Sequence, residues 1–194
     1  SSTWQRSSMK VIGYSARRYA GATRWAIGGQ ATLLTCPPVT DGSFLEGTVG
    51  YRTFDGADVV VLNLHGTPKN TEWYGDEGVV ALRAETLAAL ELDGVGVCAV
   101  NCYLGDEPSI LHNALWRAGV AWLLAGAGEN YGGRNRPVGA DVLIKHFLRA
   151  LEGKGPEGAL GRAKVMAQLT APRWTPDQRE ALADALEFKL LRRP

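Results

Sequence analysis

Four short apolar runs, each rich in β-branched residues and bounded by polar residues or glycine, constrain the fold of this 194-residue chain most strongly. They occupy residues 11–14, 59–64, 95–101 and 120–125. A strand with one face in water alternates apolar and polar residues, so continuous apolar runs indicate strands that are covered on both faces. Strands of that kind are typical of parallel sheets with helices on both sides.

Helical periodicity separates and follows these runs. Apolar residues recur at helical spacing in residues 84–90 and 110–118, and in three later segments at 143–151, 160–167 and 182–190. The last helix is expected to begin at Thr175, because a capping box with Gln178 and a proline at the first helical position mark a helix start. The order predicts an α/β fold: a three-layer sandwich with a mostly parallel central sheet and helices on both faces.

The remaining segments give weaker signals. Residues 25–35 are expected to form one or two strands, and residues 73–82 a β-hairpin, because Gly75-Asp76-Glu77-Gly78 separates two strand-like ends. We expect residues 9–194 to form a single domain. Residues 1–8 are either an added tail or an upstream segment of a longer protein.

Composition excludes several classes of protein. Twenty-one Lys and Arg against 20 Asp and Glu give a net charge of +1, without the basic excess of a nucleic-acid binder. No window of about 20 apolar residues marks a membrane span. The three cysteines are too few for a disulfide scaffold, which favours reduced thiols and a cytoplasmic location. No nucleic-acid or membrane partner, cofactor or metal is expected, and the spacing of Cys98 and Cys102 does not match a zinc knuckle.

Reactive side chains follow two of the predicted strands. The run at 59–64 leads into His65-Gly66, and the run at 95–101 leads into Cys102. If these strands are neighbours, a base and a nucleophile meet at the carboxyl edge of the sheet, where open α/β sheets carry their sites. The N–H groups of Gly66 and Cys102 could form an oxyanion hole. A helix beginning near Ser109 would favour the Cys102 thiolate through its dipole.

Each of these residues also has a structural interpretation. A cysteine at a strand end is commonly a small buried hydrophobe, and a histidine before glycine is commonly a turn residue. Cys98, four residues before Cys102, is assigned to the core. Cys36 is placed in a loop with no evident partner.

The order of these elements resembles that of the caspase-like cysteine peptidases, and is most similar to a CHAT domain. His65-Gly66 follows an apolar strand, and Cys102 comes 37 positions later, after a glycine-turn hairpin and a short helix. A helix that closes on Ala118-Gly119, an aromatic-bearing helix at 146–153 and an Ala-Leu helix at 158–164 continue the resemblance, which covers about residues 57–169. The resemblance implies the caspase-haemoglobinase fold and a His65/Cys102 dyad. It also implies a protein or peptide substrate, with a regulatory partner or upstream domain.

The chain departs from the family pattern around the cysteine. Val100 stands two residues before Cys102, where many members have an acidic residue, and Tyr103-Leu104 replaces a glycine-rich segment. The stretch 126–134 stands where the family more often has a tryptophan and an aspartate. The specificity pocket of the family is therefore not carried over to this chain.

Candidate substrate-binding residues come from the predicted loops. Asp106 and Glu107 could receive a basic side chain of the substrate, or could complement the dipole of the following helix. Trp73 and Tyr131 could form apolar subsite walls, or could cover the edge of the core. Gly126-Ala127-Gly128 follows a strand as in a dinucleotide-binding loop, but Tyr131 stands where the third glycine belongs, so a wall of the cleft is the favoured interpretation.

Three functions are compatible with these patterns. The first is a cysteine endopeptidase in which a His65/Cys102 dyad hydrolyses peptide bonds of protein substrates. The second is a catalytically silent caspase-like module that acts as an interaction or regulatory domain. The third is a flavodoxin-like nucleotide binder, which would require the glycines of residues 126–133 to hold phosphate.

Overall fold

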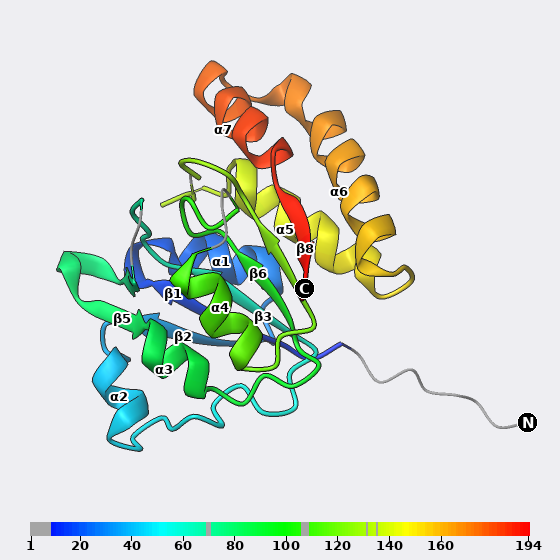
Figure 1. The fold of residues 1–194 in the computed structure, drawn as a ribbon. Helices are drawn as coiled ribbons and strands as arrows, with labels where there is room; N and C mark the ends of the chain where they lie inside the picture. Colours follow the sequence, from blue (N-terminus) through cyan, green and yellow to red (C-terminus); the bar gives the residue numbers. More distant parts are fainter. Residues whose placement is uncertain (1–8, 69–70, 106–108, 131, 135) are drawn as a thin grey trace, which may run out of the picture.

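The computed structural model describes residues 9–68, 71–105, 109–130, 132–134 and 136–194, and it has the predicted α/β architecture (Figure 1). Its main sheet has six strands in the order β2-β1-β3-β6-β7-β8. All neighbouring strands pair in parallel except β8, which is antiparallel to β7. The strands of this sheet are β1 (Val11–Ala16), β2 (Thr32–Cys36), β3 (Val59–Asn63), β6 (Gly96–Ala99), β7 (Trp122–Ala125) and β8 (Lys189–Arg192).

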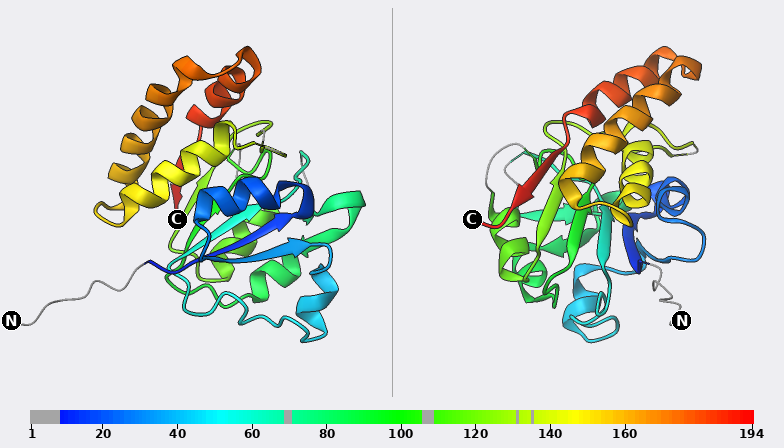
Figure 2. Two further views of the ribbon diagram at one scale, coloured as in Figure 1. Left: turned by 180° about the vertical axis from the view of Figure 1, so that it is seen from behind. Right: turned by 90° about the vertical axis from the view of Figure 1, so that its right-hand side faces the viewer.

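Helices cover the two faces of the sheet, and Figure 2 shows the two sets on opposite sides in its right-hand view. Successive side chains of a strand point to opposite faces, so Val60 and Leu62 pack with the first set while Val59 and Val61 pack with the second. The first set is α2 (Asp41–Leu45), α3 (Ala84–Ala89) and α4 (Ile110–Arg117); the second is α1 (Ala20–Ile27), α5 (Gly139–Leu151), α6 (Pro156–Thr170) and α7 (Pro176–Leu186).

The hairpin predicted at residues 73–82 is confirmed. It consists of β4 (Glu72–Tyr74) and β5 (Val80–Arg83), which pair antiparallel, with the short 3-10 helix η2 (Asp76–Gly78) at its turn. Two further 3-10 helices are η1 (Arg17–Tyr19) and η3 (Ala171–Arg173). The hairpin extends from the end of the molecule at which the parallel strands finish (Figure 1).

Most of the predicted elements are confirmed, including the capping box of α7, in which Thr175 N–H donates to Gln178 Oε1 at 2.9 Å. Two are wrong. Trp25 lies in α1 rather than in a strand, and β2 begins only at Thr32. The last helix stops at Leu186, so Leu190 lies in β8, where it pairs with Leu124 of β7. Pairing with β8 satisfies backbone groups of β7 that would otherwise be left at the sheet edge.

The strand order places a topological switch between β1 and β3. Helix α1 connects β1 to β2 and packs on one face of the sheet. Helix α2 connects β2 to β3 and packs on the opposite face, and β3 pairs with the other edge of β1. In open α/β sheets, the crevice at the carboxyl ends of such strands is the usual binding position. No helix in the described ranges is both long enough and apolar enough to span a membrane.

Helix α7 lies against the start of α5 at Gly139. A Cβ atom at this position would overlap the backbone carbonyl of Ala181. We predict that Gly139→Ala lowers the free energy of unfolding by about 1–3 kcal/mol, because α7 must move away. Gly161→Ala on α6 is the matched control, since nothing lies near its Cβ and helix propensity favours alanine by about 1 kcal/mol. Urea denaturation of both variants tests this, and equal stability of the two would contradict it.

Candidate active site

The carboxyl ends of β3 and β6 bring His65 and Cys102 to the same edge of the sheet, as the sequence predicted for neighbouring strands. Leu62 of β3 pairs with Ala99 of β6, and each candidate residue lies three positions beyond its member of this pair. Gly66 lies directly against the cysteine: a Cβ on Gly66 would be 2.6 Å from the carbonyl oxygen of Cys102 and 3.4 Å from its nitrogen. Only glycine allows the two backbones to approach this closely.

The hairpin fixes the backbone of His65. The His65 N–H donates to the carbonyl of Tyr74 at 2.8 Å, and the Tyr74 N–H donates back to the carbonyl of His65 at 3.0 Å. The imidazole is half-buried. Its Nε2 lies 3.8 Å from Oδ1 of Asp76, and its ring centroid lies 5.1 Å from that of Tyr19. His65 is therefore held between the hairpin turn and the segment that follows β1.

Asp76 links the hairpin turn to that segment. Its Oδ2 accepts the backbone N–H of Arg18 at 2.9 Å, and its Oδ1 accepts the Arg18 Nε–H at 2.6 Å. A carboxylate beside one imidazole nitrogen favours the tautomer that carries its proton there. With Nε2 directed at Asp76, Nδ1 of His65 is the nitrogen available as a base.

Burial lowers the pKa of His65, and the positive charge of Arg18 lowers it further, while Asp76 acts in the opposite direction. The imidazole is therefore neutral at pH 7. A neutral histidine can accept a proton, which a general base must do.

Cys102 makes its hydrogen bonds to Asn130, in the segment that follows β7. The thiol donates to the carbonyl of Asn130 at 3.5 Å, and the Asn130 N–H donates to Sγ at 3.3 Å. Burial raises the pKa of Cys102, and the Asn130 N–H partly opposes this effect. Within the described part of the chain no hydrogen bond joins His65 to Cys102, so the resting site holds a neutral thiol and a neutral imidazole.

The segment after β7 is hydrogen-bonded to residues 101–105, the loop that contains Cys102. The N–H groups of Tyr103 and Gly105 donate to the carbonyls of Gly128 and Gly126, at 2.6 and 2.8 Å, and Asn130 Nδ2 donates to the carbonyl of Asn101 at 3.2 Å. A Cβ at Gly105 would lie 2.7 Å from the Gly126 backbone. A Cβ at Gly126 would overlap the Asn130 side chain and the Phe188 ring, so close packing accounts for this glycine too, and the segment packs beside Cys102.

Two buried side-chain amides, those of Asn101 and Asn130, lie next to Cys102. Asn101 Oδ1 accepts the N–H of Leu64 at 3.1 Å, which joins the residues that precede His65 and Cys102. The Nδ2 of Asn101 and the Oδ1 of Asn130 are buried and have no hydrogen-bond partner among the residues that the structure describes. These two amides therefore retain hydrogen-bonding capacity next to the thiol.

Asp141 binds the backbone of the later part of the segment that follows β7. Its carboxylate accepts the N–H groups of Gly133 and Val138, at 2.8 and 3.1 Å, and so ties the segment to the start of α5. Burial raises the pKa of Asp141 to about 6. A buried carboxylate is retained here because it satisfies backbone donors that have no helical partner.

Of the predicted substrate-binding residues, the structure describes only Trp73. Trp73 is 1% exposed, so its assignment as a substrate wall is wrong; its side chain packs in the core with Leu82 and Leu87. Asp106, Glu107 and Tyr131 lie outside the described residues. The assignment of Cys98 to the core is confirmed, because it is fully buried and burial raises the pKa of its thiol.

Cys36 is not the loop residue that was expected. It is the last residue of β2 and is fully buried, with its Sγ 3.9 Å from the carbonyl of Val79, against the hairpin. A Cβ on Gly75 would be 2.5 Å from this sulfur. Cys36 thus packs beneath the hairpin that carries Asp76.

Sequence reasoning missed four residues of the site: Arg18, Tyr19, Asp76 and Asn130. The signal for Asp76 was present, because it lies in the turn of a hairpin that directly follows His65-Gly66. The other three lie in segments that reach the site only through the strand order. Across the described ranges, no three His, Cys, Asp or Glu side chains are grouped so that they could hold a metal ion.

Comparison with protein-family models gives no match for this chain, and a search of curated proteins finds no significantly similar sequence. The assignment of a function therefore depends on the geometry of the site.

The opposing charges at His65 lead to a direct prediction. Asp76→Asn should lower the pKa of His65 further, because it removes a negative charge and leaves Arg18 unpaired. Arg18→Gln should raise the pKa, because it removes the positive charge. The chain has only three histidines, so NMR titration of the imidazole protons can follow His65. Shifts of the same sign in the two variants would contradict the geometry.

Proposed function

We propose that this protein is a cysteine endopeptidase in which Cys102 is the nucleophile and His65 is the general base. The observation that carries the proposal is the contact of the Gly66 and Cys102 backbones at the ends of adjoining parallel strands. It supports the proposal because it places the backbones that carry the thiol, the imidazole and a glycine N–H at the carboxyl edge of the sheet, beside the β1–β3 switch. The resemblance to CHAT domains supports the same assignment.

The proposed reaction uses Nδ1, the ring nitrogen of His65 that does not face Asp76. Sγ of Cys102 leaves Asn130 and attacks the carbonyl carbon of the scissile peptide, while its proton passes to Nδ1 of His65. The N–H groups of Gly66 and Cys102 stabilise the oxyanion. The imidazolium, stabilised by Asp76, then donates the proton to the leaving amine as the C–N bond breaks. Water, deprotonated by His65, hydrolyses the thioester and releases the thiol.

A specific observation favours a second candidate, the catalytically silent regulatory module. The Cys102 thiol is hydrogen-bonded to Asn130 on both its donor and acceptor sides, and burial raises its pKa. A thiol held in this way is a poor nucleophile unless it is released. The two functions differ in whether Cys102 turns over a peptide.

Cleavage of fluorogenic peptides distinguishes them. With reductant and peptides that carry Arg, Lys, Asp, Asn or Leu before the scissile bond, we expect the wild type to cleave at least one series. Cys102→Ala should lower kcat/KM by about 1,000-fold or more, and His65→Gln by about 100-fold or more. The acid limb of the pH profile should lie below pH 6.5, because the pKa of His65 is lowered.

The matched control is Cys98→Ala, which removes the other thiol of this chain segment at a fully buried position. It should retain activity if circular dichroism shows that it is folded. Cleavage that persists in Cys102→Ala would refute the peptidase. Absence of cleavage by the wild type in every series would favour the silent module.

A further inference from the structure

A pocket of about 380 Å³ lies among the helices of the second face, away from Cys102. Trp25 of α1 and Trp174, which follows η3, contribute its aromatic surfaces. Lys145, His146 and Arg149 of α5 contribute three basic side chains. Its volume is within the range of about 300–1,000 Å³ that is typical of small-molecule sites.

The periodicity of α5 assembles the basic side. Val142, Lys145, His146 and Arg149 stand at positions i, i+3, i+4 and i+7, so they share one face of the helix. Helix α1 packs against this face and places Trp25 beneath Lys145, with Nζ 3.5 Å from the ring centroid. A cation over an aromatic ring is attracted by the negative face of the ring.

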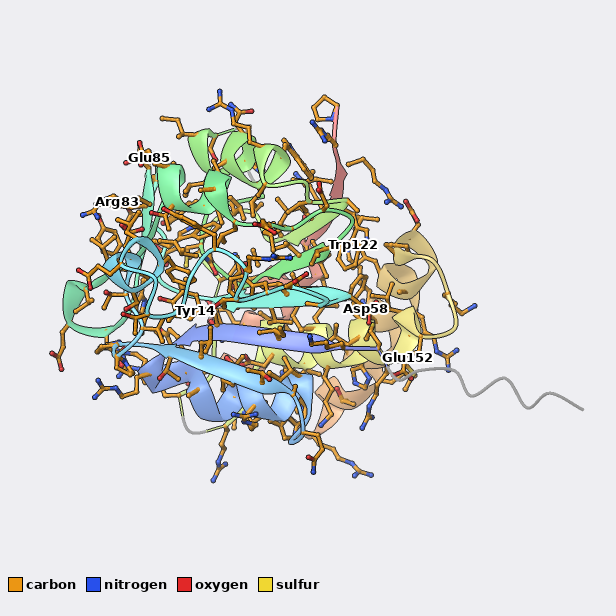
Figure 3. The ribbon with its side chains drawn as sticks, turned by 90° about the horizontal axis from the view of Figure 1, so that it is seen from below. Tyr14, Asp58, Arg83, Glu85, Trp122 and Glu152 are labelled. Atoms are coloured by element: carbon orange, nitrogen blue, oxygen red, sulfur yellow. The ribbon has the colours of Figure 1, made fainter. Side chains whose placement is uncertain are left out.

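The titratable side chains that line the pocket are all basic. In the part of the chain that the structure describes, no carboxylate lines it. Glu152 lines a second hollow of about 230 Å³, which shares Trp25, Lys145 and Arg149 with this pocket. Figure 3 labels Glu152 at the side of the molecule away from Arg83 and the hairpin.

The basic groups also repel one another. Burial lowers the pKa of Lys145, and the neighbouring charge of Arg149 lowers it further. Burial, Arg149 and Lys145 together lower the pKa of His146. Like charges held together beside apolar surface are stabilised by an anion.

The aromatic side of the pocket is accessible. Trp25 is 40% exposed, which is unusual for so large an apolar side chain, and Trp174 is half-buried. An exposed aromatic surface next to two cations indicates a ligand that has both a flat apolar part and a negative charge.

We propose that this pocket binds a small aromatic anion, with its ring against Trp25 and Trp174 and its carboxylate or phosphate on Lys145 and Arg149. The proposal does not rest on the peptidase activity, because the hydrogen bonds, ion pair and ring contact described above for His65 and Cys102 involve none of the pocket residues.

Isothermal titration calorimetry with 2-naphthoate and with 1-naphthyl phosphate tests the proposal and separates a carboxylate from a phosphate preference. We expect at least one of these probes to bind with a Kd of about 0.1–1 mM, the affinity expected for a ligand of this size. Binding should weaken between 50 and 300 mM NaCl, because screening reduces the attraction of the cations. The neutral analogue 2-naphthalenemethanol and the ring-free anions acetate and inorganic phosphate should bind at least about 10-fold more weakly.

Lys145→Met and Arg149→Met should each weaken binding by about 10-fold, since each removes one charge-assisted contact. Lys154→Met is the matched control, because Lys154 is exposed beyond the end of α5 and outside the pocket; its affinity should equal that of the wild type. Failure of both naphthyl anions to bind at 10 mM would overturn the proposal. Equal binding by all three variants, or by the neutral analogue, would also overturn it.

Discussion

The candidate site depends on the close contact between the backbones of Gly66 and Cys102. These residues lie beyond β3 and β6, which pair in parallel, and any side chain at position 66 would enter the space of the Cys102 carbonyl. The contact fixes where the chain emerges from both strands. It sets the backbone of His65, which the hairpin holds, beside the backbone of Cys102, whose thiol bonds to the segment after the neighbouring strand β7. Without it, the reactive side chains would be separate features of two loops.

Electrostatics and burial set the resting state of these side chains. Asp76 is shared between Arg18 and His65, so the positive charge that lowers the pKa of the imidazole also holds the carboxylate that orients it. Burial raises the pKa of the thiol, and Asn130 holds it by two hydrogen bonds. These shifts favour a neutral imidazole at His65 and a neutral thiol at Cys102. In the proposed peptidase, activation would consist of moving the Cys102 side chain from Asn130 toward His65, with proton transfer during the attack.

The fold was largely predictable because its signals are local. Continuous apolar runs identified β1, β3, β6 and β7, and apolar periodicity and capping identified the later helices. Two failures came from tertiary context. Trp25 lies in a helix that ends in glycines, which short-range reasoning interpreted as a strand region. Leu190 continues the helical spacing of α7, yet pairing with β7 makes it part of a strand.

The site was predictable only where its residues follow strands. His65, Gly66 and Cys102 could be placed together, because parallel neighbours finish at the same edge. The inward direction of Trp73 depends on how the hairpin packs on the sheet, which no local pattern encodes. Arg18 and Asn130 reach the site from β1 and β7, and their approach follows from the strand order rather than from their own sequence.

The central claim, that His65 activates Cys102 as a nucleophile, is tested most directly by the pre-steady-state reaction with p-nitrophenyl acetate. This ester requires no specificity pocket, so acylation reports the thiol and its base alone. We expect a burst of one equivalent of p-nitrophenolate per chain, acetyl transfer to Cys102 by mass spectrometry, and a burst at least about 100-fold slower in His65→Gln. A burst rate unchanged by loss of the imidazole, or acetylation elsewhere than Cys102, would contradict the account.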